Sequence, residues 1–286
     1  MHRIILWTLI LAGFSVAAYI IFFGVPYYTA ELTLRPRMEL HDVLRPSGRY
    51  GHGYGIAGSA MLLLLFLYSV RKRVRWFPKI GRLSTWLKYH MFLGVMGPVL
   101  VTFHTTFKFG GIVSVSYWSM VIVMLSGFVG RYLYSRIPRT ISGHEMNLQQ
   151  VQEENRHLAE QLRTEFDVPA SIFNKIAEIG SVRQTGDSEF RTILRGFWAD
   201  LKRPFELRSI FAELKEVGDI GSQKRKSLRK LARRRAALNR NLSILEVTHR
   251  FFHHWHVFHK PFAYVMILIM FIHIGVVLLF GYQWIF

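Results

Sequence analysis

Long apolar runs alternate with strongly charged segments along the chain. Five runs approach or reach the length of about 20 apolar residues with which a helix crosses the hydrocarbon core of a bilayer. They lie at residues 4–23, 55–70, 86–107, 115–134 and 257–280. The pattern predicts an all-α integral membrane protein with about five transmembrane helices. The first run is longer than the core of most signal peptides and no A-x-A cleavage site follows it, so an uncleaved anchor is expected.

The charged segments indicate how these helices are oriented. Residues 25–54 carry both acidic and basic side chains, whereas residues 71–88 carry only basic ones. Because cytoplasmic loops are enriched in Lys and Arg, the second segment is expected in the cytoplasm. The N-terminus is then cytoplasmic and the C-terminus external, and the runs at 86–107 and 257–280 cross the membrane in the same direction. We expect a multi-pass protein of a bacterial inner membrane.

Residues 138–254 form a charged insertion that contains no apolar run of membrane length. Two parts of it repeat residues at alternating steps of three and four, which is the spacing of a coiled-coil seam. The seam positions are Leu148, Val151, Asn155, Leu158 and Leu162 in the first part, and Leu228, Leu231, Arg235, Leu238, Leu242 and Leu245 in the second. Since the first part is acidic and the second basic, we predict a cytoplasmic, coiled-coil-like antiparallel hairpin with a small helical lobe at about 169–221.

The predicted domains follow from this division. Residues 1–137 hold transmembrane helices 1 to 4, residues 138–254 hold the hairpin and its lobe, and residues 255–286 hold the fifth transmembrane helix. The formal net charge is +19, and a basic run lies at residues 224–235. Such a charge is typical of nucleic-acid binding, but beside a membrane span we expect no nucleic-acid partner. Anionic lipid is the stronger alternative for this run.

Two of the apolar runs each hold histidines fourteen residues apart, His90 with His104 and His259 with His273. In an α-helix, fourteen residues turn back to within about 40° of the starting direction and rise about 21 Å. Each pair therefore lies on one helix face, with one histidine towards each side of a bilayer core about 30 Å thick. Because the two helices are expected to be parallel, His90 opposes His259 and His104 opposes His273. Each opposed pair can hold one haem iron by two axial imidazoles, which predicts two non-covalent b-type haems.

The membrane position of these histidines supports a functional role. Ionisable side chains inside a span are costly and are usually functional. A neutral imidazole that binds iron through one nitrogen and donates its other N–H to a backbone carbonyl has both nitrogens satisfied. A structural hydrogen-bonding role for the four is the alternative. Weaker candidates, with no partner fourteen residues further on or with a place in or beside a loop, are His253, His254, His256, His41 and His52.

Neighbouring residues extend the candidate site. Gly94 and Gly97 lie between the two histidines of the third run. A glycine there lets a porphyrin approach the backbone, or equally lets two helices pack closely. Cations near the membrane edge are candidates to pair with haem propionates. These cations are Lys88, Arg131 and Lys260 on the cytoplasmic side and Lys108 on the external side.

The composition limits the chemistry of the chain. It has no cysteine, which excludes disulfides, Cys-ligated iron–sulfur clusters and covalent haem attachment through C-x-x-C-H. It also has no P-loop, and no nucleotide-binding domain is expected. Electrons that the protein carries must therefore come from, and go to, other molecules.

The pairs His90/His104 and His259/His273 give the chain a resemblance to the membrane dihaem cytochrome b superfamily, in particular to ferric-reductase-like transmembrane domains. In that family two spans each carry a His-x-(about 13)-His pair that ligates two stacked b-type haems. Ferric reductases and NADPH oxidases commonly add a flavin and nicotinamide domain, which this chain lacks, and a short loop stands where this chain has its long insertion. The resemblance covers about residues 86–137 and 256–281.

The sequence thus predicts spans bundled around two b-type haems, with electrons passing between a cytoplasmic-side haem on His90 and His259 and an external-side haem on His104 and His273. We expect an electron-transfer subunit of an oxidoreductase rather than a complete enzyme. Redox partner proteins would bind on one or both sides, with the hairpin as a docking platform. Two alternatives stay open. One is a cytochrome b subunit of a quinol-linked oxidoreductase with a bound quinone, and the other is a haem-free membrane scaffold or sensor that uses the hairpin.

Overall fold

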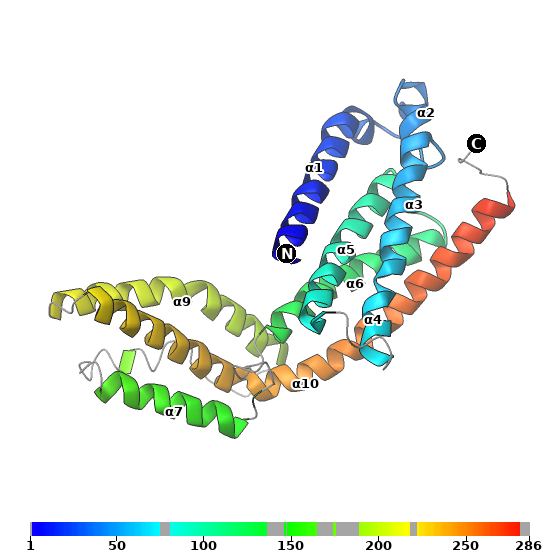
Figure 1. The fold of residues 1–286 in the computed structure, drawn as a ribbon. Coiled ribbons are helices and arrows are strands. Elements are labelled where there is room, and N and C mark those ends of the chain that lie inside the picture. Colours follow the sequence, from blue (N-terminus) through cyan, green and yellow to red (C-terminus); the bar gives the residue numbers. More distant parts are fainter. Residues whose placement is uncertain are drawn as a thin grey trace. The chain divides into compact units, whose positions relative to one another are not determined.

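The computed structural model describes residues 2–74, 81–135, 146, 148–164, 174–175, 189–217 and 222–280, and these residues form helices and no strand. Figure 1 shows the helices in chain order. Their bounds are α1 His2–Thr29, the 3-10 helix η1 Arg35–Arg37, α2 His41–Leu44, α3 Arg49–Leu64, α4 Phe66–Arg73, α5 Leu83–His104, α6 Val113–Tyr134, α7 Leu148–Thr164, α9 Glu189–Val217 and α10 Ser222–Leu279.

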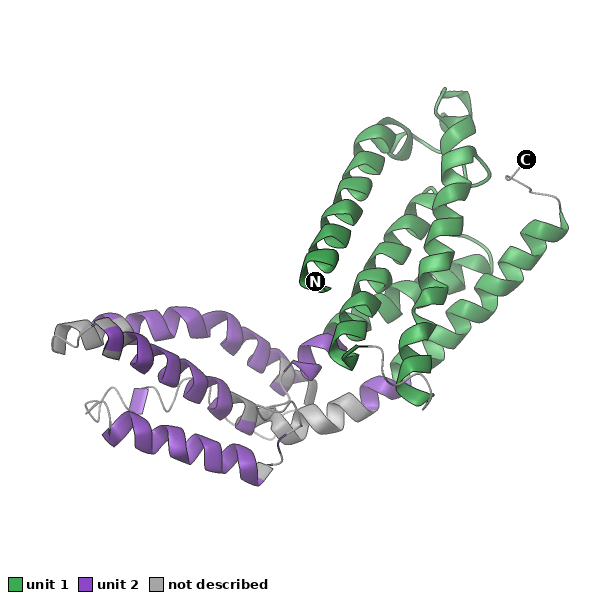
Figure 2. Ribbon diagram, viewed as in Figure 1, with its two compact units in different colours: residues 1–128, 258–286 green, residues 129–257 purple. Residues whose placement is uncertain are grey.

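The chain divides into two compact units (Figure 2). The first comprises residues 1–128 and 258–286, and the second comprises residues 129–257. The predicted insertion, residues 138–254, falls within the second unit. The unit boundaries cut through α6 and α10, so each of these two helices contributes residues to both units.

Four helical segments are long and apolar enough to cross a membrane. They are His2–Thr29, His41–Arg73, Val113–Tyr134 and His254–Leu279. These segments overlap four of the five runs predicted as spans, and they make the chain an all-helical membrane protein. The second segment is interrupted at Leu65, where α3 ends and α4 begins.

The remaining predicted span, at 86–107, coincides with α5 and is not among the four. Its 22 residues extend about 33 Å at 1.5 Å per residue, which is long enough to cross the core. Its apolarity is lower because it carries Lys88, Pro98 and two histidines. Helix α5 also packs along α3 and contacts α1 and α4, and five of its residues are buried. A helix covered by other helices faces less lipid and so needs a less apolar surface. The count of five spans stays a prediction.

The core of the first unit consists of two buried clusters. One joins Leu62 of α3, Met120 of α6, and Met266 and Met270 of α10. The other joins Ile20 of α1 to Leu100 and Phe103 of α5. Helices α3, α5, α6 and the last part of α10 therefore enclose a common interior, and α1 covers the outer side of α5 (Figure 1).

The two seams of the predicted hairpin pack against each other in the second unit. Val151 and Leu158 of α7 form a buried cluster with Leu238 of α10. Within the same seam, the Asn155 side-chain amide donates a hydrogen bond to the Asn239 amide oxygen at 2.6 Å. Asn155 is a seam position and Asn239 follows the seam residue Leu238, and a polar seam residue with a partner on the facing helix favours one register of the two helices.

Opposite charges also join α7 to α10. Arg234 of α10 forms an ion pair with Glu154 of α7 at 2.6 Å, as expected for a basic seam against an acidic one. The neighbouring Arg235 is only 7 % exposed, and this burial lowers the pKa of its guanidinium group. Helix α10 continues without a break over 58 residues, so the second hairpin arm and the last membrane span are one helix.

The region predicted as a small lobe contains a long helix. Helix α9 has 29 residues and includes Pro204 in its interior. One face of it is buried through Thr192, Leu207 and Ile210, while other parts of its surface are exposed. A single amphipathic helix therefore occupies most of the described part of this predicted lobe.

Candidate functional site

His104 and His273 approach each other in the interior of the first unit. His104 is the last residue of α5 and His273 lies near the end of α10, and their ring centroids are 6.4 Å apart with an angle of 62° between the ring planes. Both side chains are partly buried. We call these two residues the His104 pair. His104 therefore faces His273 at this end of the two helices, as expected from the fourteen-residue spacing.

The backbone of α3 holds the His104 ring. Nδ1 of His104 lies 2.9 Å from the carbonyl oxygen of Gly51, which can only accept, so Nδ1 carries the proton and donates it. One turn further along α3, a Cβ added at Gly55 would lie 2.7 Å from Nδ1 of His104. Only glycine lets the imidazole lie this close to the helix. The remaining nitrogen of the ring, Nε2, keeps its lone pair for another partner.

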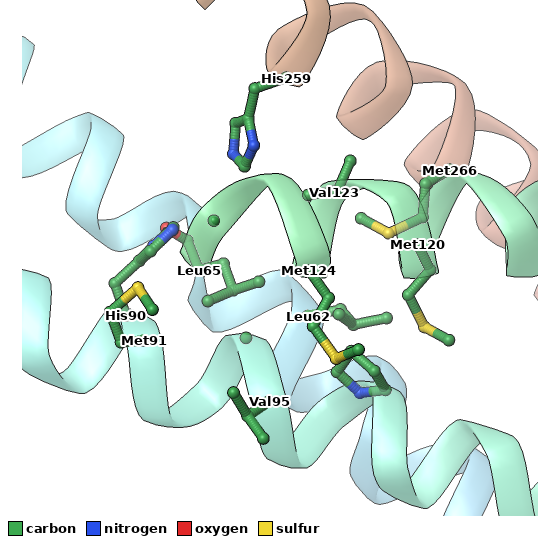
Figure 3. A pocket seen from close by; sticks show the side chains of 13 residues that line it. Leu62, Leu65, His90, Met91, Val95, Met120, Val123, Met124, His259 and Met266 are labelled. Atoms are coloured by element: carbon green, nitrogen blue, oxygen red, sulfur yellow. The ribbon is translucent and has the colours of Figure 1, made fainter. Parts of the chain in front are cut away.

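His90 and His259 lie at the other end of the same helices and line one cavity, and we call them the His90 pair. Figure 3 shows the two rings directed into the same space, His90 from α5 and His259 from α10. Helix α3, the residue that follows it and helix α6 add further walls with Leu62, Leu65, Met120, Val123, Met124 and Gly127. The lining is apolar apart from the two imidazoles.

Each imidazole of the His90 pair is oriented through its Nδ1 atom. Nδ1 of His90 donates to the carbonyl of Leu65 at 3.3 Å, at the break between α3 and α4. Nδ1 of His259 lies 2.6 Å from the hydroxyl of Ser126. The Ser126 hydroxyl donates its single proton to the carbonyl of Val123 at 2.9 Å, so it accepts the N–H of His259. In both residues Nε2 is again the nitrogen that can bind a ligand.

The hydrogen bonds of three of the four histidines therefore follow one scheme. A backbone carbonyl or a serine hydroxyl accepts the Nδ1 proton of His90, His104 and His259. This hydrogen bond fixes the neutral tautomer and the orientation of the ring. In histidines that bind a metal, an acceptor on the other ring nitrogen has the same effect. Two imidazoles at each level are a donor set that could hold a haem iron.

The cavity at the His90 pair has a volume of about 40 Å³, which is smaller than a porphyrin. Four of its lining residues are methionines, namely Met91, Met120, Met124 and Met266. Methionine has three rotatable bonds and repacks at low cost. Gly94 and Gly127 add no side-chain bulk, and a Cβ at Gly127 would meet nothing within 4 Å. The methionines and glycines are therefore the part of this lining that can repack most easily.

A close contact between α3 and α5 joins the two levels. A Cβ added at Gly58 would lie 2.7 Å from Val101 and 3.0 Å from the carbonyl oxygen of Gly97, and one at Gly97 would lie 3.2 Å from Leu62. Small residues at such crossings let two backbones approach closely. Of the two glycines predicted on α5, Gly94 lines the cavity and Gly97 belongs to this helix contact.

The glycines of α3 also contain the letters of a dinucleotide-binding fingerprint. Gly53, Gly55 and Gly58 match G-x-G-x-x-G. That fingerprint requires a strand before the glycines and a helix that begins at them. Here all three lie within α3, which is part of a membrane-spanning segment, and Gly55 and Gly58 serve close helix and ring contacts. The match therefore does not indicate nucleotide binding.

The cations predicted near the haems are exposed in the structure. Lys88 lies two residues before His90 on α5, Lys260 follows His259 on α10, and Lys108 lies just beyond the end of α5. Arg131 belongs to the second unit and lies over the ring of Tyr134 at 6.0 Å. Their role towards propionates stays a prediction.

The weaker histidine candidates separate into distinct environments. Nδ1 of His41 lies 3.1 Å from the hydroxyl of Tyr27. His52 is partly buried and lies within electrostatic range of both His104 and His273, so it is closer to the His104 pair than a loop position predicts. His254 is exposed and His256 packs against Trp255, whereas the side chain of His253 lies outside the described residues.

The sequence analysis missed the groups that orient the histidines, which are Gly51, Gly55, Leu65 and Ser126. Gly51 and Gly55 form a G-x-x-x-G pair, which is a signal of close packing in membrane helices. No such signal marks Leu65 or Ser126. Across the described part of the chain, no group of three or more His, Asp or Glu side chains is placed to hold a metal ion. A bis-histidine haem site needs only two.

Comparison of the chain with models of protein families, with curated proteins and with solved structures gives no match.

Proposed function

We propose that the chain is a b-type dihaem membrane cytochrome that carries electrons across the membrane as a subunit of a redox complex. The observation that carries the proposal is the repeated arrangement at two levels of α5 and α10. At each level two imidazoles face a common space, and three of the four histidines donate their Nδ1 proton and keep Nε2 for a ligand. A structural role alone would not require opposed imidazoles at both levels.

In this proposal the protein residues hold, orient and insulate the redox groups. A bound haem would supply one-electron chemistry, and the two imidazoles at each level would hold its iron. The carbonyls of Gly51 and Leu65 and the Ser126 hydroxyl keep each ring in one tautomer. The apolar lining of methionine, valine and leucine lowers the local polarity, which together with these hydrogen bonds sets the redox potential.

The haem content of single and double histidine variants tests this proposal. The purified wild-type chain is expected to hold two haems per protein. His90→Ala and His259→Ala should each lose one haem, and the double variant of both should lose no more, because both residues serve one iron. The double variant His90→Ala with His104→Ala should lose both haems. His254→Ala, at an exposed position on α10, is the matched control and should keep two.

Two results would contradict the assignment. Wild-type protein without the reduced-minus-oxidised absorption bands of b-type haem would favour the haem-free scaffold. Retention of two haems in each of the single variants His90→Ala, His259→Ala, His104→Ala and His273→Ala would show that other residues hold the iron.

The orientation of the chain in the membrane is part of the proposal. The basic residues Arg71, Lys72 and Arg73 end α4 and mark that end of the segment as cytoplasmic. The second unit then lies in the cytoplasm and the end of α10 near Leu279 lies outside. A reporter that is active only in the cytoplasm should be inactive when fused after Phe286, and activity there would reverse the orientation.

A further inference from the structure

Helix α9 exposes a continuous apolar stripe on the side opposite to its buried face. At about 100° per residue, its exposed apolar residues fall within about 100° of the helix circumference. The exposed fractions are large for such side chains, at 56 % for Trp198 and 68 % for Phe205. The residues of this stripe are Leu194, Phe197, Trp198, Leu201 and Phe205.

Basic side chains border this stripe. Arg191, Arg195 and Lys202 are exposed and lie along one edge of the stripe at about 60–100° from its centre, and Arg208 lies at its other edge. Glu206 is exposed further round the helix, about 120° from the centre of the stripe. An apolar face rich in Phe and Trp with Lys and Arg at its border is the pattern of a helix that lies in a membrane interface.

The stripe is attached to the end of a membrane span. The hydroxyl of Tyr132, in the last turn of α6, donates a hydrogen bond to Asp200 of α9 at 3.0 Å, and the Tyr132 ring packs edge-on against Phe197 with centroids 5.6 Å apart. Helix α6 lies in the segment Val113–Tyr134, which is apolar and long enough to cross the bilayer. Tyrosines near the ends of spans lie at the level of the lipid headgroups. The middle of α9 is therefore held at that level.

We propose that the stripe of α9 inserts into the surface of an anionic lipid bilayer at the Tyr134 end of α6. The aromatic and leucine side chains enter the boundary between headgroups and acyl chains, and Arg191, Arg195 and Lys202 pair with lipid phosphates. Burial of the stripe in lipid removes a large apolar surface from water, and each basic residue adds attraction to anionic headgroups. The second unit is thereby attached to the membrane independently of the haems.

The absence of cysteine from the chain allows a direct test with single nitroxide labels. The full-length protein would carry Leu201→Cys or Phe205→Cys on the stripe, with Glu206→Cys as the matched control next to Phe205 but off the stripe. Each labelled protein is placed in nanodiscs of phosphatidylcholine with phosphatidylglycerol. We expect a several-fold higher ratio of collisions with oxygen to collisions with a water-soluble nickel complex at 201 and 205 than at 206, because oxygen concentrates in lipid. Circular dichroism checks that each variant keeps its helix content.

Other outcomes would overturn the proposal. A ratio at 201 and 205 equal to that at 206 would place the stripe in water. Labels shielded from both reagents and broadened by a second spin would show that another copy of the chain covers the stripe. The charge component has its own test, since Arg191→Gln with Lys202→Gln should lower the ratio at 205 in anionic nanodiscs. An unchanged collision ratio at 205 would show that pairing of these basic residues with anionic lipid does not hold the stripe in the bilayer.

Discussion

The two histidine pairs lie on the same two helices at the same spacing, yet their surroundings differ. At the His104 pair the ring of His104 lies directly on the α3 backbone, with Gly51 as its hydrogen-bond acceptor and Gly55 as the position where a Cβ has no room. At the His90 pair the rings face a cavity with four methionines in its wall. The first level is shaped by backbone, which cannot repack, and the second by flexible side chains, which can.

This difference predicts unequal responses to substitution. Backbone atoms that line a site cannot move aside when a larger side chain is added. Methionine side chains can change rotamer and so make room for it. The following variants test this contrast, from the largest expected effect to the smallest. The two variants on α3 use Gly53→Ala as a common control, because a Cβ at Gly53 meets nothing within 4 Å.

Gly55→Ala should remove the haem of the His104 pair. The new Cβ would lie 2.7 Å from Nδ1 of His104, so the ring must move and its bond to Gly51 must break. The measurement is the haem-to-protein ratio by pyridine haemochrome, which should fall from two towards one while Gly53→Ala keeps two. Two haems in Gly55→Ala would show that this contact does not govern ligation.

Gly127→Leu should lower the haem content of the His90 pair only in part. The side chain enters the cavity between His90 and His259, but the methionines around it can yield. Combining Gly127→Leu with His104→Ala leaves only this level, so the residual haem reports on it directly. Complete loss in that double variant would mean that the cavity is as rigid as the other level.

Ser126→Ala should weaken haem binding at the His90 pair without abolishing it. Loss of the hydroxyl leaves Nδ1 of His259 without the acceptor that orients it. Removing such an outer partner typically costs about 10- to 100-fold in metal affinity. Transfer of haem to apomyoglobin measures this change, and Ser114→Ala, whose hydroxyl donates to the carbonyl of Gly111, is the matched control. Equal transfer rates would contradict the orienting role.

Gly58→Ala should affect both levels equally and only slightly. Its Cβ would press on Val101 and on the Gly97 carbonyl, so α3 and α5 separate by a small distance. Overpacking of this kind costs about 1–3 kcal/mol of unfolding free energy. Thermal unfolding in detergent, compared with Gly53→Ala to cancel the helix propensity of alanine, measures it. A loss confined to one haem would show that the two levels are not joined through this contact.

The sequence alone determined the features that depend on local periodicity. Spans are set by the length of an apolar run, and four of the five predicted ones recur as segments able to cross a membrane. The fourteen-residue spacing places His104 and His90 on one face of α5 by helix geometry. The seam of Val151, Asn155 and Leu158 likewise follows from its three- and four-residue steps, and it packs against α10 as the pattern predicts.

Tertiary structure alone decided which groups meet across helices, because contacts between helices depend on their rotation and depth, which no local period fixes. The tertiary structure places Gly51, Leu65 and Ser126 where they accept hydrogen bonds from the histidines. It also places Gly97 in the contact with α3 rather than in the cavity. It also left the aromatic stripe of α9 exposed beside the end of α6. The amphipathic pattern of α9 shows that it has two faces, but only packing determines which of them the protein buries and which one stays exposed.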